Sequence, residues 1–232
     1  RCTVVMPVYN EEEAIGDAIA EIRAHVLSLL PESEIVVVND GSKDKTGEIL
    51  DALVKEEPRV RVIHKKNGGH GSAVIAGADS ASGEWLFIID SDRQIPMEPF
   101  AALWHAVEKG ADAAFGVRRQ RNDPQVRLWL TAFIRYSLRV LFNVRLYDAN
   151  VPYKLIPRAL WRDARSLIPD STLAPSLFLA LILARRGVRI AEIEVPHRDR
   201  QTGVVSIRRW RLFRFCVLAL MQLIRFRREI AK

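Results

Sequence analysis

The sequence Trp85-Leu-Phe-Ile-Ile-Asp-Ser-Asp-Arg-Gln94 (WLFIIDSDRQ) places two carboxylates directly after five apolar residues. An apolar run of this length is typical of a strand that is buried on both faces. Two like charges one residue apart repel each other, and a bound cation relieves that repulsion. Oxygen ligands of this kind suit a hard divalent cation that bridges to phosphate, although a simple polar turn is the alternative. The pattern therefore predicts a buried strand with a candidate metal or phosphate site at its carboxyl end.

Outward from this segment, strand-like and helix-like patterns alternate. Further strands are predicted at 2–6, ended by Pro7, and at 35–38, 60–63 and 111–117, with helices at 11–30, 44–55, 71–82 and 99–109. This order favours an α/β fold with a mostly parallel sheet and helices on both faces. Ligands of such sheets bind beyond the carboxyl ends of the strands. Tyr9, Asp40 and Asp90 all fall at such ends, so we expect one common crevice.

The pattern changes after the fifth strand. Helices are predicted at 127–143 and 173–184, a strand at 188–195, a polar loop at 198–207 and an apolar segment at 212–224. There is no repeat and no Gly/Ser-rich linker. We therefore expect one catalytic domain over residues 1–207, followed by a basic amphipathic helix over 208–232.

The net charge of +7 is concentrated near the carboxyl end of the chain. Residues 198–232 contain 10 of the 35 basic residues and 2 of the 28 acidic ones, a local net charge of +8, and residues 1–197 have a net charge of −1. A uniformly basic nucleic-acid binder would not show this distribution, so nucleic acid is not an expected partner. A local anionic partner, such as a membrane surface or a phosphate group, fits better.

The segment 212–224 has 13 residues, fewer than the roughly 20 that a helix needs to cross a bilayer. Because arginine clusters flank it, it is predicted to lie at a membrane interface. A helix that docks on the protein core or forms an oligomer is the alternative. Cys2 and Cys216 have neither disulfide-framework nor zinc-site spacing, and no signal peptide is visible, so a reducing compartment is expected.

Polar residues also follow the first two predicted strands. The ring of Tyr9 could stack on a nucleobase, and the Asp40 carboxylate could accept hydrogen bonds from base N–H groups. A β-turn is the alternative for Asp40, with Asp44 as a plausible N-cap of the next helix. Glu11 either bonds to a base or ribose or favours a helix N-terminus.

A glycine-rich loop and several arginines complete the candidate set. Asn67-Gly-Gly-His-Gly-Ser72 precedes a helix and could approach phosphate, but it matches neither a P-loop nor a dinucleotide fingerprint. His70 has a structural or a functional role. Arg118 closes the fifth strand, and Arg135 and Arg139 share one face of the next helix. Planar guanidinium groups in an apolar setting suit phosphate recognition.

As a set, these motifs resemble inverting family 2 glycosyltransferases with the GT-A fold, most closely the group of dolichol-phosphate mannose synthases and other polyprenyl-phosphate glycosyltransferases. The resemblance covers about residues 3–207. It rests on the order VVMPVYNE, VVVNDGSKDKT, GHGSA, ASGEWLFIIDSDRQIPME, GVR, IRYSLRVLFN, DANVPYK and EIEVPHRDRQTGVVS.

The resemblance implies a nucleotide site and a metal site. The residues that would hold the base and ribose are Pro7, Tyr9, Glu11, Val38 and Asp40. Asp90, Ser91 and Asp92 would form a D-x-D element, in which Asp90 contacts the nucleotide or a metal-bound water. Asp92 and Gln94 would bind Mg²⁺ or Mn²⁺.

The resemblance also implies the reaction. Arg118 and Arg135 would receive the acceptor phosphate, and Arg200 would hold the donor diphosphate. A mannose-type or glucose-type sugar would pass, with inversion, from a nucleoside-diphosphate sugar to dolichyl or undecaprenyl phosphate. The enzyme would work at the cytoplasmic face of a membrane, as a peripheral protein or anchored by segments outside this sequence.

Two alternatives remain. The acceptor could be a sugar hydroxyl in polysaccharide or glycolipid synthesis, which needs a general base such as Asp148 or Asp123. The chain could also be a non-catalytic nucleotide-binding module at a membrane. It departs from the family pattern at Arg93, where leucine is usual, and at Pro152-Tyr-Lys154, where Gly-Phe-Arg is usual.

Overall fold

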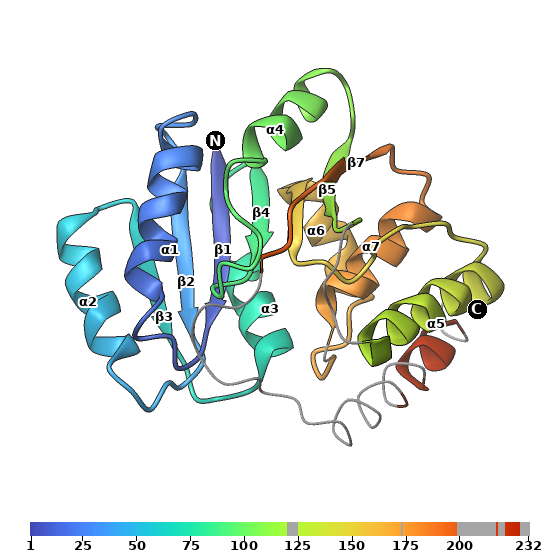
Figure 1. The fold of residues 1–232 in the computed structure, drawn as a ribbon, viewed down its shortest axis with the longest axis horizontal. Helices are drawn as coiled ribbons and strands as arrows, with labels where there is room; N and C mark the ends of the chain where they lie inside the picture. Colours follow the sequence, from blue (N-terminus) through green and yellow to red (C-terminus); the bar gives the residue numbers. More distant parts are fainter. Residues whose placement is uncertain (120–124, 173, 199–216, 218–220, 228–232) are drawn as a thin grey trace.

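A seven-stranded sheet forms the centre of the computed structural model, which describes residues 1–119, 125–172, 174–198, 217 and 221–227 (Figure 1). The strand order is β3-β2-β1-β4-β6-β5-β7. The strands are β1 (Cys2–Val8), β2 (Glu34–Asn39), β3 (Val60–His64), β4 (Trp85–Ile89), β5 (Ala113–Val117), β6 (Tyr153–Pro157) and β7 (Ile190–Glu194). All neighbouring strands pair in parallel except at β6, which is antiparallel to both β4 and β5. The predicted mostly parallel α/β sheet is therefore confirmed.

Helices flank the sheet on both faces (Figure 1). They are α1 (Ile15–Ile22), continued by the π-helix η1 (Arg23–Leu27), α2 (Thr46–Glu56), α3 (His70–Ser80), α4 (Phe100–Glu108), α5 (Gln125–Phe142), α6 (Arg158–Arg165) and α7 (Pro175–Arg185). Side chains of β1 alternate between two cores. Met6 packs in the core that contains residues of α1, α2 and α4. Val5 packs in the core that contains residues of α3, α5, α6 and α7.

Two elements, β6 and α6, are not predicted by the sequence pattern. Pro152 precedes β6, Pro157 is its last residue and Lys154 is its second, so the segment lacks the apolar run of a buried strand. The structure nevertheless buries Lys154 completely. Its Nζ donates to the carbonyl of Val151 and lies 5.0 Å from the ring centroid of Phe115.

Most predicted boundaries shift by one or two residues in the structure, and the differences around Pro7, Ile15 and Asp44 bear on the site. Strand β1 continues through Pro7 to Val8 and still pairs with β2 there, so Pro7 does not end it. The helix predicted over 11–30 begins only at Ile15. Helix α2 begins at Thr46, so Asp44 is not its N-cap, although Asp44 Oδ1 accepts a hydrogen bond from the Thr46 N–H at 3.1 Å.

The described part of the carboxyl-terminal segment docks on the protein core. Residues 221–227 are helical and lie beside α5 (Figure 1). Leu223 and Phe226 are buried, and the Phe226 ring lies 5.4 Å from that of Phe178. These residues therefore pack on the protein core, and the predicted membrane contact of the segment stays a prediction. The rest of the predicted helix over 208–232, apart from Val217, lies outside the described residues.

Within the part of the chain that the structure describes, no helix combines the length and the apolar character that crossing a membrane requires.

Glycine-to-alanine substitutions in α3 and in α1 should have opposite effects on stability, because α3 packs closely on the sheet at its glycine and α1 does not. A Cβ atom at Gly77 would lie 2.5 Å from Cγ1 of Val5, so Gly77→Ala should lower the free energy of unfolding by about 1–3 kcal/mol. At exposed Gly16 in α1, no described atom lies within 4 Å of the added Cβ. Gly16→Ala should therefore raise that free energy by about 0.5–1 kcal/mol. Urea unfolding tests both, and equal effects at the two sites would contradict this packing.

Candidate active site

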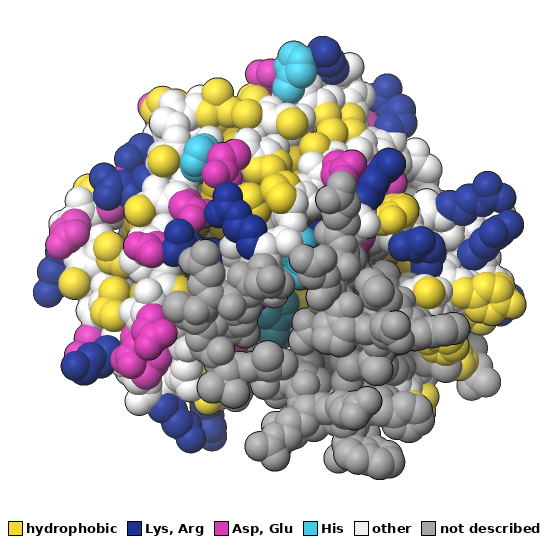
Figure 2. Space-filling view, in the orientation of Figure 1, with side chains coloured by type: hydrophobic (Ala, Val, Ile, Leu, Met, Phe, Trp, Pro, Cys, Tyr) yellow, Lys and Arg dark blue, Asp and Glu magenta, His cyan; other side chains and the backbone are white. Residues whose placement is uncertain are grey.

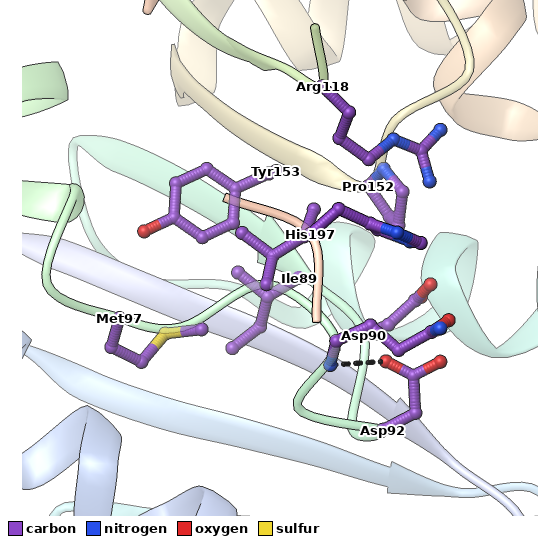
Figure 3. Close-up of a pocket in the computed structure, with 10 residues that line it drawn as sticks. Ile89, Asp90, Asp92, Met97, Arg118, Pro152, Tyr153 and His197 are labelled. Atoms are coloured by element: carbon purple, nitrogen blue, oxygen red, sulfur yellow. Dashed lines mark hydrogen bonds between the residues drawn. The ribbon is translucent and has the colours of Figure 1, made fainter. Parts of the chain in front are cut away.

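A pocket opens where strand β4 ends and strand β6 begins, because these antiparallel strands pair Ile89 with Tyr153. Asp90 and Asp92 lie on one side of this pocket, and Arg118 and Tyr153 lie on the other, with His197 between them (Figure 3). Its polar lining residues are Asp90, Asp92, Gln94, Arg118 and His197. The structure thus gathers four of the predicted site residues around one space.

Asp90 interacts with the glycine-rich loop at the start of α3. His70 Nε2 lies 2.8 Å from Asp90 Oδ1. Partial desolvation of the His70 ring opposes its ionisation, but the nearby carboxylates of Asp90, Asp92 and Asp40 outweigh this and raise the pKa of His70. His70 therefore links the D-x-D element to the loop before α3. The sequence left its role open.

Asp92 and Gln94 lie in the turn that follows β4. The Gln94 N–H donates to Asp92 Oδ1 at 3.1 Å, the dashed line of Figure 3. The Gln94 carbonyl accepts a hydrogen bond from the Arg198 N–H at 2.8 Å. This contact holds the turn against the segment that follows β7.

The donor atoms of this turn fit a divalent cation. Carboxylate and amide oxygens are hard ligands of the kind that Mg²⁺ and Mn²⁺ accept. No three His, Cys, Asp or Glu side chains among the described residues form a metal-binding group. A cation held by Asp92 and Gln94 would therefore complete its shell with phosphate oxygens and water, as Mg²⁺ commonly does.

Arg93 ties the same turn to helix α1. Its backbone has φ 56°, a left-handed conformation that residues other than glycine rarely adopt. Its guanidinium group donates to Glu21 Oε1 at 2.6 and 3.0 Å and to Asp17 Oδ2 at 2.5 Å. Arg93, at a position where the family usually has leucine, therefore has a structural role. Its side chain fixes the turn that contains Asp92 and Gln94 to helix α1.

Arg93→Leu should weaken metal-dependent nucleotide binding without unfolding the protein. The partly buried ion pairs of Arg93 should contribute about 1 kcal/mol to the stability of the turn. If that free energy is lost from cation binding, half-saturation requires a roughly fivefold higher metal concentration. Isothermal titration of Mn²⁺ with UDP and with GDP measures this. Arg189→Leu, which removes an exposed arginine paired with Asp112, is the matched control. Equal binding by both variants would rule out the bracing role.

Arg118 forms a bidentate ion pair with a buried carboxylate. Its Nε and Nη2 donate to the two oxygens of Asp148 at 2.7 and 3.1 Å. The Asp148 side chain is 3% exposed and that of Arg118 is 15% exposed. Arg135 lies nearby, with its Cζ 4.3 Å from the ring centroid of Tyr147, the residue before Asp148. The two predicted phosphate-binding arginines therefore flank the turn at 147–148.

Lys154 follows this turn in the chain and is missing from the sequence-derived site. Burial is the main cause that lowers the pKa of its ammonium group to about 7, against an opposing contribution from Asp148. Its position in the family's Gly-Phe-Arg motif was the only sequence signal. His197, which also lines the pocket, was missed because a single histidine after a strand is common in loops.

The predicted nucleotide residues lie at the carboxyl ends of β1 and β2. Tyr9 is exposed, whereas Glu11 and Asp40 are buried. Asp40 accepts hydrogen bonds from Lys65 Nζ and from the N–H groups of Gly68 and Gly69, at 2.6, 2.9 and 2.7 Å. It therefore anchors the glycine-rich loop.

Three further residues of the predicted nucleotide site are buried. Pro7 and Val38 are paired neighbours in the sheet and are buried, so their side chains form the floor beneath this edge. Ser91 is buried between the two aspartates. Arg200 lies outside the described residues, so its predicted role remains a prediction.

The fold and the arrangement of the carboxylates at the end of β4 define a GT-A glycosyltransferase domain. The chain belongs to glycosyl transferase family 2, whose family model matches residues 3–171. The resemblance inferred from the motifs is therefore confirmed.

Curated relatives narrow the comparison. The chain is 32% identical over 206 residues to an undecaprenyl-phosphate 4-deoxy-4-formamido-L-arabinose transferase of Pseudomonas fluorescens, covering 87% of this chain and 58% of that protein. The protein of the same name from Pseudomonas aeruginosa is 29% identical over 204 residues, with the same coverage. The chain thus spans somewhat more than half the length of the curated relatives that it matches.

Solved structures agree on the fold. Glucosyl-3-phosphoglycerate synthase from Mycobacterium tuberculosis, in complex with Mn²⁺, UDP and phosphoglyceric acid, superposes with a TM-score of 0.70 at 21% identity, covering 97% of this chain and 78% of that one. S. aureus TarS 1-349 in complex with UDP gives a TM-score of 0.66 at 21% identity, covering 98% and 65%.

Proposed function

We propose that this chain is the catalytic domain of an enzyme that transfers a sugar from a nucleoside-diphosphate sugar to a polyprenyl phosphate, with a divalent cation. The main support is the pocket in which Asp90 and Asp92 face Arg118. Acidic groups suit a metal–diphosphate complex, and an arginine across the pocket suits a second phosphate. The curated relatives are named as undecaprenyl-phosphate transferases, which agrees with this assignment.

On the donor side, the chain binds and orients the leaving group. Asp92 and Gln94 would hold the cation, which when bound would supply positive charge beside the leaving diphosphate. Asp90, held by His70, contacts the nucleotide side of the complex. Tyr9, Glu11 and Asp40 bind the nucleoside.

On the acceptor side, Arg118 and Arg135 position the phosphate for attack on the anomeric carbon, with inversion. An acceptor phosphate is already an anion at neutral pH, so attack needs no strong general base. Asp148, a candidate base for a hydroxyl acceptor, is buried and holds Arg118 with both oxygens. This engagement favours the phosphate acceptor over the hydroxyl alternative.

Helix α5 provides a surface suited to the lipid part of the acceptor. Phe133, Tyr136 and Val140 are 45%, 66% and 57% exposed, at a spacing that places them along one side of the helix. Arg135 and Arg139 are exposed on the same helix. Figure 2 shows hydrophobic and basic side chains next to each other at the right of the molecule, where Figure 1 places α5. Apolar groups with flanking arginines suit the interface of an anionic membrane.

Replacement of Phe133, Tyr136 and Val140 together by serine should weaken binding to anionic vesicles by about tenfold or more, because the inserted apolar area is lost. Co-sedimentation with phosphatidylglycerol vesicles measures it. The control is Leu29→Ser with Val54→Ser, since these residues are also exposed but lie in the turn after η1 and in α2, far from α5 in sequence. Equal losses in both variants would contradict docking through α5.

A transfer assay tests the function directly. Radiolabelled nucleotide sugars, including mannose, glucose and 4-deoxy-4-formamido-L-arabinose donors, are incubated with Mn²⁺ and undecaprenyl or dolichyl phosphate. Label that enters the lipid phase only in the presence of metal supports the proposal. Label that enters an oligosaccharide but not the lipid would establish the hydroxyl alternative. Nucleotide binding without any transfer would favour a non-catalytic module.

A further inference from the structure

Tyr147 lies in the segment that connects α5 to β6, and two arginine side chains lie close to its ring. The ring belongs to a residue that is 36% exposed. Cζ of Arg135, on α5, lies 4.3 Å from the ring centroid, and Cζ of Arg119, just after β5, lies 5.7 Å from it. A cation is attracted to the face of an aromatic ring within about 6 Å of its centroid. Arg135 is therefore the better placed of the two for this interaction.

Contacts to two strands of the sheet fix the backbone that carries this ring. The Tyr147 N–H donates to Glu192 Oε1, on β7, at 2.9 Å. The next residue, Asp148, accepts two hydrogen bonds from Arg118, directly after β5. The position of the ring therefore does not depend on α5. Tyr147 can act as a fixed support for an arginine that α5 brings to it.

The two arginines assigned to the acceptor phosphate are held in chemically different ways. Arg118 directs Nε and Nη2 to a carboxylate that is 3% exposed, so its charge is balanced within the protein. Among the described residues, the Arg135 guanidinium group lies over the Tyr147 ring and forms no ion pair with a carboxylate. An aromatic face orients a guanidinium group but takes up neither its charge nor its N–H donors. Arg135 therefore keeps its positive charge for an anionic ligand.

Orientation of this kind favours binding because Arg135 is exposed. A long, exposed side chain populates many rotamers, and a ligand that fixes it must offset the lost conformational entropy. A ring that already favours one arrangement of the guanidinium group lowers that cost before the ligand arrives. The interaction with Tyr147 is thus suited to prepare Arg135 for a phosphate group.

We propose that Tyr147 is a positioning residue for the acceptor phosphate, and that its ring holds the Arg135 guanidinium group ready for that phosphate without neutralising it. This inference rests on the proposed function, because it concerns the acceptor side of the same reaction. Tyr147 acts through Arg135 and does not touch the reacting atoms. The competing role, in which the Tyr147 hydroxyl itself donates to the phosphate, is an outcome of the test.

The test is steady-state transfer to undecaprenyl phosphate, with the KM of the acceptor and the KM of the donor measured separately. Tyr147→Leu should raise the acceptor KM by about three- to tenfold, since the attraction between ring and cation is lost. The kcat and the donor KM should stay within about twofold, because the loss affects acceptor binding alone. Tyr147→Phe keeps the aromatic face and should keep the wild-type acceptor KM. An equal loss in both variants would show that the hydroxyl acts, and would overturn the proposal.

Double variants identify the arginine through which Tyr147 acts. In an Arg135→Met background, Tyr147→Leu should change the acceptor KM no further, because the partner of the ring is already absent. Arg119→Met provides the matched control, since it removes the other arginine near the same ring. In that background, Tyr147→Leu should keep its full effect. The reverse pattern would assign the effect to Arg119 and overturn the role of Arg135.

Ring fluorination decides the matter even if Tyr147→Leu folds poorly. Phenylalanine analogues with increasing numbers of ring fluorines, placed at position 147, keep the shape of the ring but weaken the negative potential of its face. The acceptor KM should rise along this series, and a constant KM would overturn the proposal. If the wild type transfers sugar to no polyprenyl phosphate, the proposed function and this inference fail together. If it does transfer but Tyr147→Leu leaves the acceptor KM unchanged, only this inference fails.

Discussion

Asp92→Asn is expected to lower the rate of sugar transfer by about 10²–10³-fold, the usual effect of removing one group that stabilises charge in a transition state. The substitution keeps the size of the side chain and an oxygen that can accept the Gln94 N–H, so the turn after β4 should keep its shape. It removes the negative charge on which cation binding depends. The loss should therefore appear in kcat at saturating donor and also as a higher Mn²⁺ requirement.

The control is Asp112→Asn, which neutralises the aspartate just before β5. Asp112 pairs with Arg189 on the surface, away from the pocket-lining residues. Neutralising Asp112 should leave the rate of sugar transfer close to that of the wild type. Chelation of the metal from the wild-type enzyme should reproduce the Asp92→Asn phenotype, and added Mn²⁺ should reverse it. An Asp92→Asn enzyme with a wild-type rate and metal requirement would remove Asp92 from the catalytic machinery.

Arg118→Met should affect both stability and transfer. The Asp148 carboxylate, 3% exposed, would lose its bidentate partner and remain as a buried charge. Breaking a buried pair in this way costs about 3–5 kcal/mol in the free energy of unfolding. Transfer should fall as well, because the guanidinium group that positions the acceptor phosphate is gone.

A double variant separates the two effects. Arg118→Met with Asp148→Asn neutralises the buried carboxylate that has lost its bidentate partner, so it should recover much of the lost stability, as measured by urea unfolding. It should not recover transfer, since the acceptor arginine is still absent. Arg189→Met, which breaks the exposed pair with Asp112, is the control and should be nearly neutral for both. If the double variant regained activity, Arg118 would act only through the fold.

Much of the fold was accessible from the sequence because local patterns and the final environment agree. The strands β1 to β5 are apolar runs with turn residues after them, and each is found close to its predicted position. Element β6 was not, because its buried Lys154 is stabilised by a carbonyl, Val151 O, and by the ring of Phe115 on another strand. No local pattern reports partners of that kind.

The site residues divide in the same way, into those that a local sequence pattern reveals and those that only a distant partner makes significant. Asp90 and Asp92 stood out because two adjacent like charges after an apolar strand are costly without a ligand. Lys65 did not stand out and the role of His70 stayed open, because each is an ordinary loop residue until the fold brings it to an aspartate. Their partners, Asp40 and Asp90, lie 25 and 20 residues away in the sequence.

By itself, the sequence determined the α/β class, the family and the polar residues that end the strands, since these depend on local composition and on motif order. Only the tertiary structure decided that β6 enters the sheet antiparallel, that Asp148 holds Arg118, that Arg93 braces the carboxylate turn on α1 and that Asp40 is largely occupied by its own loop. The physical reason is that ion pairs and buried hydrogen bonds join residues far apart in the chain. Their geometry exists only after the sheet has brought its strand ends to one edge.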